Sequence, residues 1–317
     1  MNSAQLDCFL AEFELGYSFF ERILGDFKSH YSLRMINKKA GGIRIIHVPS
    51  AELRWIHSRI LSHFRRAKFV FPPHVQGGIV GRSPRTNASF HTGKDAVLSL
   101  DLENFFDFIT FEQVQNSLEE FGCKTDLAVL FAKLVTFEGR IPQGASTSVF
   151  IANLVGLKLD EKILPITERF ALDYSRYIDD ISISGSFLKE DIFSQISKEI
   201  EDLGFRINFE KVKMQRKHRR QTVNNVVVNT RTNVRRKYIK HVKNDLHYCE
   251  QYGIFGHCEQ LGLEQDSFVK SLAARIGYIN SIDSVRGSVL IARFHALKNN
   301  SDTDIHFIEF QRKSSLN

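Results

Sequence analysis

The order of apolar and polar positions along the chain predicts a mixture of helices and strands. Over residues 52–67, apolar side chains recur at helical spacing and arginines occupy the remaining faces, as is typical of an amphipathic helix. Two strand-like runs joined by Gly41 and Gly42 predict a basic hairpin, and the apolar run "AVLSLDL" predicts a buried strand over residues 96–102. Helical spacing of apolar residues also predicts helices over 111–122, 125–137, 147–164 and 188–203.

The C-terminal part of the chain has a different pattern from the rest. After about residue 233 the pattern is entirely helical and predicts helices over residues 235–252, 265–282 and 286–299. Before that point, strands and helices follow one another without strict alternation, and residues 224–229 form a further strand-like run. We therefore expect an α+β fold with a helical subdomain at its C-terminal side.

The stretch "YSRYIDDISISG", residues 174–185, places two aspartates between two strand-like runs. Asp179 and Asp180 fall where a hairpin turn is expected, so they project from the end of a sheet. Aspartates are common in turns, and the pair alone is weak evidence of a function. Asp101, however, ends the predicted strand 96–102. If these elements are neighbours in one sheet, three carboxylates converge, and such a cluster needs divalent cations such as a pair of Mg²⁺ ions.

Positive charge is concentrated in one segment. The net charge is +7, yet residues 211–243 contain twelve Lys and Arg and no Asp or Glu, so the rest of the chain carries −5. A solvated charged face usually mixes both signs. The one-sided charge therefore favours a surface that binds a polyanion such as a nucleic acid.

Several classes of protein do not fit this sequence. No run of about eighteen apolar residues predicts a membrane span, and the N-terminal residues do not have the pattern of a signal peptide, so a cytoplasmic location is expected. The cysteines are scattered and form no CxxC pair, which argues against a disulfide framework or a zinc site.

Four motifs occur in a characteristic order: "LDLENFF", "IPQGASTSVFIANL", "YIDD" and "GFRINFEKVK". In this order and spacing they resemble a reverse transcriptase of the prokaryotic type. The resemblance implies a right-hand polymerase fold with fingers, palm and thumb. The corresponding division of the chain is 1–95 for N-terminal helices and fingers, 96–229 for the palm with part of the fingers, and 230–317 for a helical thumb.

The resemblance also implies an active site for nucleotidyl transfer. Asp101 and Asp179 would bind two Mg²⁺ ions, supported by the carbonyl of Leu102 and by Asp180, with deoxynucleoside triphosphates as substrates. Lys211 resembles the lysine proposed as general acid for the pyrophosphate, although a plain contact to a backbone phosphate is an equal alternative.

Further residues match positions that bind the incoming nucleotide in this family. Phe106 falls at the steric gate that excludes a 2′-hydroxyl, with a core phenylalanine as the alternative reading. Gln143 and Gly144 resemble the turn that lets the backbone approach nucleotide and template. Arg44 resembles the fingers residue that holds the triphosphate, with Lys38 and Lys39 as weaker candidates.

One string is similar to retron reverse transcriptases, which use a dedicated structured RNA as primer and template. "GRSPRTNASFH" contains Asn87 and His91 in an NAxxH pattern; the alternative is an Asn-capped turn with a surface histidine. Asn224 and Asn225 stand where the retron pattern has Thr-Gly. The basic residues expected to bind RNA and its cDNA are Arg219, Arg220, Arg235, Arg236, Lys237 and Lys240.

The resemblance implies a role in antiviral defence, together with a noncoding RNA and an effector protein. Two alternatives remain open: another defence-associated or group II intron-like reverse transcriptase, and a catalytically silent RNA-binding scaffold. The oligomeric state is not indicated by the sequence.

Overall fold

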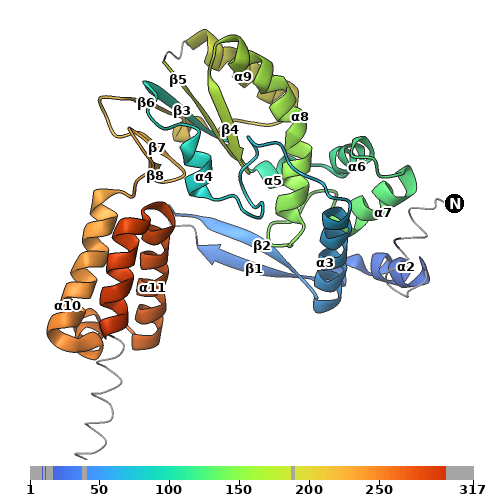
Figure 1. Cartoon of the computed structure of the whole chain (residues 1–317). Helices are drawn as coiled ribbons and strands as arrows, with labels where there is room; N and C mark the ends of the chain where they lie inside the picture. The colour runs from blue at the N-terminus through green and yellow to red at the C-terminus, as the bar shows by residue number, and fades with distance from the viewer. Residues whose placement is uncertain (1–8, 10, 12–16, 38–40, 187–189, 298–317) are drawn as a thin grey trace, which may run out of the picture. The chain divides into compact units, whose positions relative to one another are not determined.

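The computed structural model describes residues 9, 11, 17–37, 41–186 and 190–297. The chain forms two compact units, which are described separately. Unit 1 comprises residues 1–91 and 95–216, and unit 2 comprises residues 92–94 and 217–317 (Figure 1). Lys38 and Lys39, proposed above as weaker triphosphate-binding candidates, lie outside the described residues, as does the start of the predicted helix 188–203.

An antiparallel sheet forms the centre of unit 1. Its strand order is β4-β5-β3-β6. The predicted strand 96–102 is confirmed as β3, and the stretch 174–185 is confirmed as a strand–turn–strand. The bounds are β3 Ala96–Asp101, β4 Asp173–Tyr177, β5 Asp180–Gly185 and β6 Lys213–Arg216.

Helices cover this sheet because their apolar faces pack against its buried residues. The helix α8 (Ser148–Arg169) packs against β4 and α9, and it continues past the predicted end at 164 through Pro165 (Figure 1). Apolar residues of the strands and helices join in a continuous hydrophobic cluster. The other helices of unit 1 whose bounds lie within the described residues are α2 Tyr17–Gly25, η1 Phe27–His30, α3 Ala51–Arg66, α4 Pro84–Ser89, α5 Phe105–Phe108, α6 Phe111–Glu120, α7 Thr125–Val135, α9 Glu190–Asp202 and η2 Phe209–Lys211.

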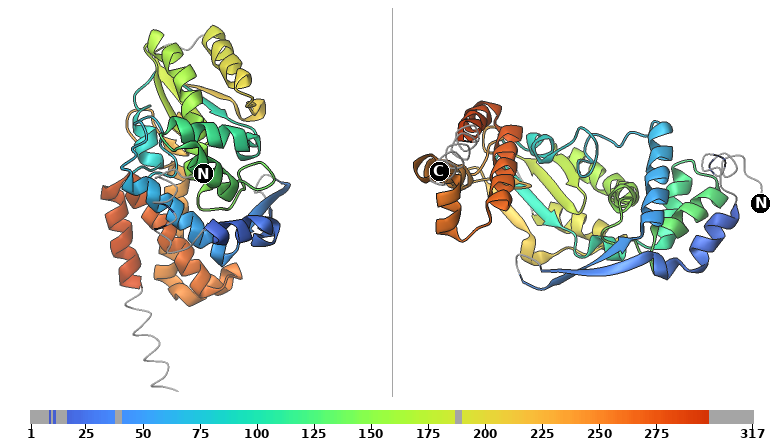
Figure 2. Two further views of the ribbon diagram at one scale, coloured as in Figure 1. Left: turned by 90° about the vertical axis from the view of Figure 1, so that its right-hand side faces the viewer. Right: turned by 90° about the horizontal axis from the view of Figure 1, so that it is seen from below.

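The predicted basic hairpin is an extended pair of antiparallel strands. Strand β1 (Tyr31–Asn37) pairs with β2 (Ile43–Pro49), and Figure 2 shows the two as one long ribbon. Ser50 then caps α3 by accepting a hydrogen bond from the Leu53 N–H, which explains why the chain turns into a helix at this point.

Unit 2 combines a short hairpin with a group of helices. Its strands are β7 (Thr222–Val223) and β8 (Val226–Val227). The expected strand over 224–229 is therefore corrected: Asn224 and Asn225 form the turn, with φ of +44° and +67°. Asparagine tolerates this left-handed conformation better than most residues.

The helical pattern predicted after residue 233 is confirmed. Helix α10 (Arg236–Leu261) is interrupted at Gly253, and it packs against α11 (Gln265–Ile282). Residues 284–297 form a further helix beside them (Figures 1 and 2). Within the described residues, no helix is long and apolar enough to cross a membrane.

Candidate active site

The three aspartates predicted from the sequence meet at one end of the central sheet. Asp101, the last residue of β3, lies directly opposite Asp180, the first residue of β5. Asp179 lies in the turn before Asp180, and its carbonyl oxygen accepts a hydrogen bond of 3.0 Å from the Leu102 N–H. The expectation that both Asp179 and Asp180 lie in the turn is corrected, because Tyr177 pairs with Asp180 and leaves Ile178 and Asp179 as the two turn residues.

A lysine ammonium already lies against one of these carboxylates. Lys211 Nζ is 2.9 Å from Asp101 Oδ2 and 3.1 Å from Asp101 Oδ1. Its position is fixed by backbone bonds, since the Asn208 N–H donates to the Asp101 carbonyl and the Lys211 N–H donates to the Asn208 carbonyl. The hydrogen bond that Lys211 donates to Asp101 raises the pKa of Lys211, so the side chain, 58% exposed, stays a cation beside the site.

The environment of Asp179 favours a bound cation. Burial raises the pKa of the Asp179 carboxyl, and the charge of Asp101 raises it further, while Lys211 and Arg44 act in the opposite direction. The charge of Arg44, an exposed residue of β2, therefore acts on the Asp179 carboxyl.

The donor set is suited to magnesium. Carboxylate and carbonyl oxygens are the hard ligands that Mg²⁺ prefers, and a partly buried pair of carboxylates requires a compensating positive charge. Among the residues that the structure describes, no three His, Cys, Asp or Glu side chains are grouped as a metal site. Asp101 and Asp179, with Asp180 and the Leu102 carbonyl, are the groups that could hold a metal at this end of the sheet.

The Gln143–Gly144 turn packs against the β1–β2 hairpin. The His47 N–H donates to the Gln143 carbonyl at 2.8 Å. Gly144 has a φ of +117°, and a Cβ there would lie 2.9 Å from the His47 carbonyl oxygen and collide with the Ile46 side chain. The glycine is therefore required by the close approach of β2, the strand that carries Arg44.

Phe106 lies in α5, a short helix that follows β3. It is half-buried and packs against the hydrophobic cluster of unit 1. Both roles weighed from the sequence, steric gate and core packing, remain open for this residue.

The NAxxH motif lies inside the protein. Asn87 and His91 have no exposed surface. The His91 ring nitrogens lie 2.7 Å from the hydroxyl oxygens of Ser184 and Ser175, so the ring joins strands β5 and β4. The expected direct contact of these two residues with RNA is corrected, because a side chain without exposed surface cannot touch RNA in this conformation. Helix α4, which contains Asn87, is capped at its N-terminus by the Ser83 side chain and not by an asparagine.

The basic residues expected to bind RNA all belong to unit 2. Arg235 is half-buried, and its Nη2 donates to Asn225 Oδ1 at 3.0 Å. The other members of the set are exposed, namely Arg219, Arg220, Arg236, Lys237 and Lys240. Unit 2 thus exposes five basic side chains of this set to solvent.

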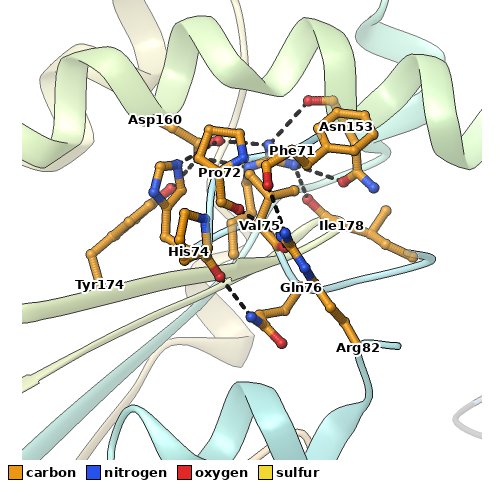
Figure 3. A network of polar contacts seen from close by, with 12 residues as sticks. Phe71, Pro72, His74, Val75, Gln76, Arg82, Asn153, Asp160, Tyr174 and Ile178 are labelled. Atoms are coloured by element: carbon orange, nitrogen blue, oxygen red, sulfur yellow. Dashed lines mark hydrogen bonds and ion pairs between the residues drawn. The ribbon is translucent and has the colours of Figure 1, made fainter. Parts of the chain in front are cut away.

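A buried polar network behind the aspartate turn was not predicted from the sequence. The Arg176 side chain, on β4, is fully buried and forms an ion pair of 2.7 Å with Asp160 of α8. The Tyr174 hydroxyl donates to the same carboxylate at 2.5 Å, and His74 Nε2 lies 3.5 Å from it (Figure 3). The sequence did contain an indication of this network. Tyr174 and Arg176 are two residues apart and so share one face of β4, and an arginine on a buried strand face needs a partner of opposite charge.

Comparison with known proteins assigns the chain to a family. The family model described as reverse transcriptase (RNA-dependent DNA polymerase) matches residues 36–242, and the chain belongs to this family. The motif resemblance is thereby confirmed, and the α+β architecture described above is the right-hand polymerase fold of that family.

Several curated relatives are retron enzymes. The retron Mx65 reverse transcriptase of Myxococcus xanthus is 31% identical, over 69% of this chain and 56% of that protein. The retron Mx162 enzyme of the same species is 29% identical, over 86% of this chain and 62% of that protein. The retron Ec86 enzyme of Escherichia coli is 30% identical over half of each chain. This chain thus covers 56% and 62% of the length of the two Myxococcus relatives.

Among solved structures, the apo telomerase from Candida tropicalis aligns with a TM-score of 0.48 and 10% identity, over 83% of this chain and 60% of that chain. A likeness of this degree is too low to carry an inference.

Proposed function

We propose that the chain is an RNA-directed DNA polymerase that copies a dedicated structured noncoding RNA into short single-stranded DNA. The observation that carries this proposal is the meeting of Asp101, Asp179 and Asp180 at the end of the sheet, with Lys211 and Arg44 acting on the same site. Membership in the reverse transcriptase family and the retron relatives support it.

In this proposal, Asp101 and Asp179 hold two Mg²⁺ ions, with the Leu102 carbonyl and Asp180 as supporting groups. When bound, the ions lower the pKa of the primer 3′-hydroxyl and neutralise charge on the triphosphate. The protein's own groups then orient the substrate.

Arg44 provides a guanidinium fork for phosphate oxygens, and the Gln143–Gly144 turn fixes the strand that carries it. Lys211 either donates the proton of its ammonium to the leaving pyrophosphate oxygen or binds a phosphate by charge alone. Phe106 lies under the sugar and favours deoxynucleotides.

The exposed arginines and lysines of unit 2 bind the RNA stem and the growing RNA–DNA hybrid. Phosphate contacts of this kind release counterions, so RNA affinity should fall steeply with rising salt concentration. The biological role we propose is antiviral defence in the cytoplasm, together with the noncoding RNA and an effector protein.

The test is purification of the wild-type protein and an Asp179→Ala, Asp180→Ala variant from cells that contain the native locus. Co-purified RNA and DNA are then sequenced. The expected result is one structured RNA joined to a short cDNA with the wild type, and the RNA alone with the variant. Asp202→Ala, at an exposed position at the end of α9, is the matched control and should leave the cDNA unchanged.

Other outcomes would contradict the proposal. RNA without any DNA that depends on Asp179 and Asp180 would favour the scaffold alternative. DNA that is untemplated or not linked to one RNA would favour another type of defence-associated reverse transcriptase.

A further inference from the structure

The turn that carries Asp179 has an unfavourable backbone conformation. Ile178 has a φ of +62°, in the left-handed region. A β-branched residue there is strained, because its Cβ substituents crowd the backbone. Such strain persists only where the surrounding structure over-determines the conformation, and it concentrates at functional sites. The contacts of Ile178 therefore show what holds the turn in place.

Arg176 is the charged residue bonded to this turn. Its Nη1 donates to the Ile178 carbonyl at 3.1 Å and to Asn153 Oδ1 at 3.1 Å. Its Nε and Nη2 donate to the two oxygens of Asp160, each at 2.7 Å, and Nη2 also reaches the Asn153 carbonyl at 3.2 Å. The guanidinium thus connects the strained turn to α8 through buried groups.

The space around these groups is fully used. A Cβ added to Gly156 of α8 would lie 2.5 Å from Arg176 Cζ, and one added to Gly77 would lie 2.8 Å from the Ile178 nitrogen. The Gly77 carbonyl accepts a hydrogen bond of 2.6 Å from Asn153 Nδ2, so the asparagine that accepts from Arg176 also binds the backbone of Gly77, next to Ile178.

The backbone of Arg176 is fixed as well. Its N–H donates to the His74 carbonyl at 2.9 Å, and its carbonyl accepts from the Gln76 N–H at 2.7 Å. Segment 74–77 and helix α8 therefore enclose the residue from two sides, and the guanidinium has little freedom to move away from the turn.

We propose that Arg176 is a positioning residue that sets the location of the Asp179 carboxylate by bonding the Ile178 carbonyl, with Asp160 anchoring the guanidinium on α8. This inference rests on the proposed role of Asp179 in holding the metal. A purely structural ion pair would make a different prediction: its loss would lower the stability of the fold but would leave the geometry of the site unchanged.

The central variant is Arg176→Lys. An ammonium keeps the positive charge next to Asp160, but it lacks the planar fork that bonds Asp160, Asn153 and Ile178 together. Gly156→Ala is the second variant: it keeps every charge and displaces the guanidinium sterically. Tyr174→Phe is the matched control, because it removes one hydrogen bond to Asp160 without touching Ile178.

Two measurements on folded protein decide the question, at a temperature well below the melting point of each variant. The first is the Mn²⁺ affinity of the free protein, followed by electron paramagnetic resonance. The second is kcat and KM for deoxynucleotide addition to a primed RNA template. We expect Arg176→Lys and Gly156→Ala to lose about ten- to a hundredfold in Mn²⁺ affinity and in kcat. Tyr174→Phe should stay within about twofold of the wild type, because the bond to the turn is intact.

The proposal is overturned if Arg176→Lys binds Mn²⁺ and turns over like the wild type, or if all three variants lose activity in proportion to their melting points. If either Arg176→Lys or Gly156→Ala fails to fold, the other variant alone is compared with the wild type and Tyr174→Phe.

Failure of the proposed function gives a different pattern. If the wild-type chain extends no primer on any template, the proposed polymerase is wrong, and the Mn²⁺ measurement still decides the role of Arg176. An affinity loss in Arg176→Lys but not in Tyr174→Phe then supports positioning, and equal affinities refute it.

Discussion

The buried ion pair between Arg176 and Asp160 makes a quantitative prediction about stability. Asp160 is 2% exposed at its side chain, and the guanidinium beside it is completely covered. Replacement of Arg176 by methionine leaves the carboxylate buried without its main counter-charge, which should cost about 3–5 kcal/mol of unfolding free energy. For a unit of this size, that corresponds to a fall of roughly 6–20 °C in melting temperature.

The second half of the prediction concerns the double variant Arg176→Met, Asp160→Asn. Asparagine removes the unpaired charge and keeps an acceptor for the Tyr174 hydroxyl. The double variant should therefore recover about 2 kcal/mol relative to Arg176→Met alone.

Urea unfolding followed by circular dichroism, with both single variants and the double variant, gives the coupling free energy directly. If Arg176→Met loses less than about 1 kcal/mol, the Asp160 carboxylate is not as isolated from water as the structure indicates. If the two single losses simply add in the double variant, the charges do not compensate each other, and the reasoning fails.

Three further changes have defined outcomes. Gly144→Ala and its control Gly122→Ala both place alanine at positive φ, which should cost each variant about 1–2 kcal/mol of unfolding free energy, measured by thermal unfolding. Gly144→Ala should lose more stability than Gly122→Ala, because only the Cβ at position 144 collides with other atoms; a Cβ at Gly122 meets no atom within 4 Å. Burial alone would raise the pKa of Asp160, yet Arg176 holds it below its usual range. Its ionised form therefore stabilises the fold at pH values above the ordinary carboxyl pKa of about 3.9, and this contribution is lost as the pH falls through the lowered pKa. When the unfolding free energy is measured against pH, the Asp160→Asn variant should not show this acid-induced loss of stability. Lys211→Met should lower kcat at least about tenfold, and Lys211→Arg separates the two roles: a phosphate contact tolerates arginine, whereas a proton donor does not.

The local elements of the site could be predicted from the sequence because their signals are local. The apolar run before Asp101 predicted β3, and the strand–turn–strand around Asp179 followed from two short β-branched and aromatic runs close together. The sequence predicted that Asp101 and Asp180 meet only if their strands are neighbours in one sheet, and the pairing of β3 with β5 fulfils this condition.

Contacts between distant segments could not be predicted in the same way. The partner of Arg176 lies in a helix whose apolar residues extend over several faces, so its pattern does not single out Asp160. His91 reads as a surface histidine in a polar string, and only the packing of α4 against β4 turns it inward between Ser175 and Ser184. In each case tertiary packing overrides the local pattern.

The connectivity of unit 2 affects how the protein folds during synthesis and which fragments of it can be prepared. Residues 92–94 belong to this unit although the chain on both sides of them lies in unit 1. The Gly93 N–H donates to the Val228 carbonyl, and the Gln221 side chain donates to the Lys94 carbonyl. On the ribosome these two early backbone groups stay hydrated until the later segment has left the exit tunnel. A fragment that begins at Lys217 would lack both bonds, so the helical part, if it is prepared alone, needs this short early segment supplied as well.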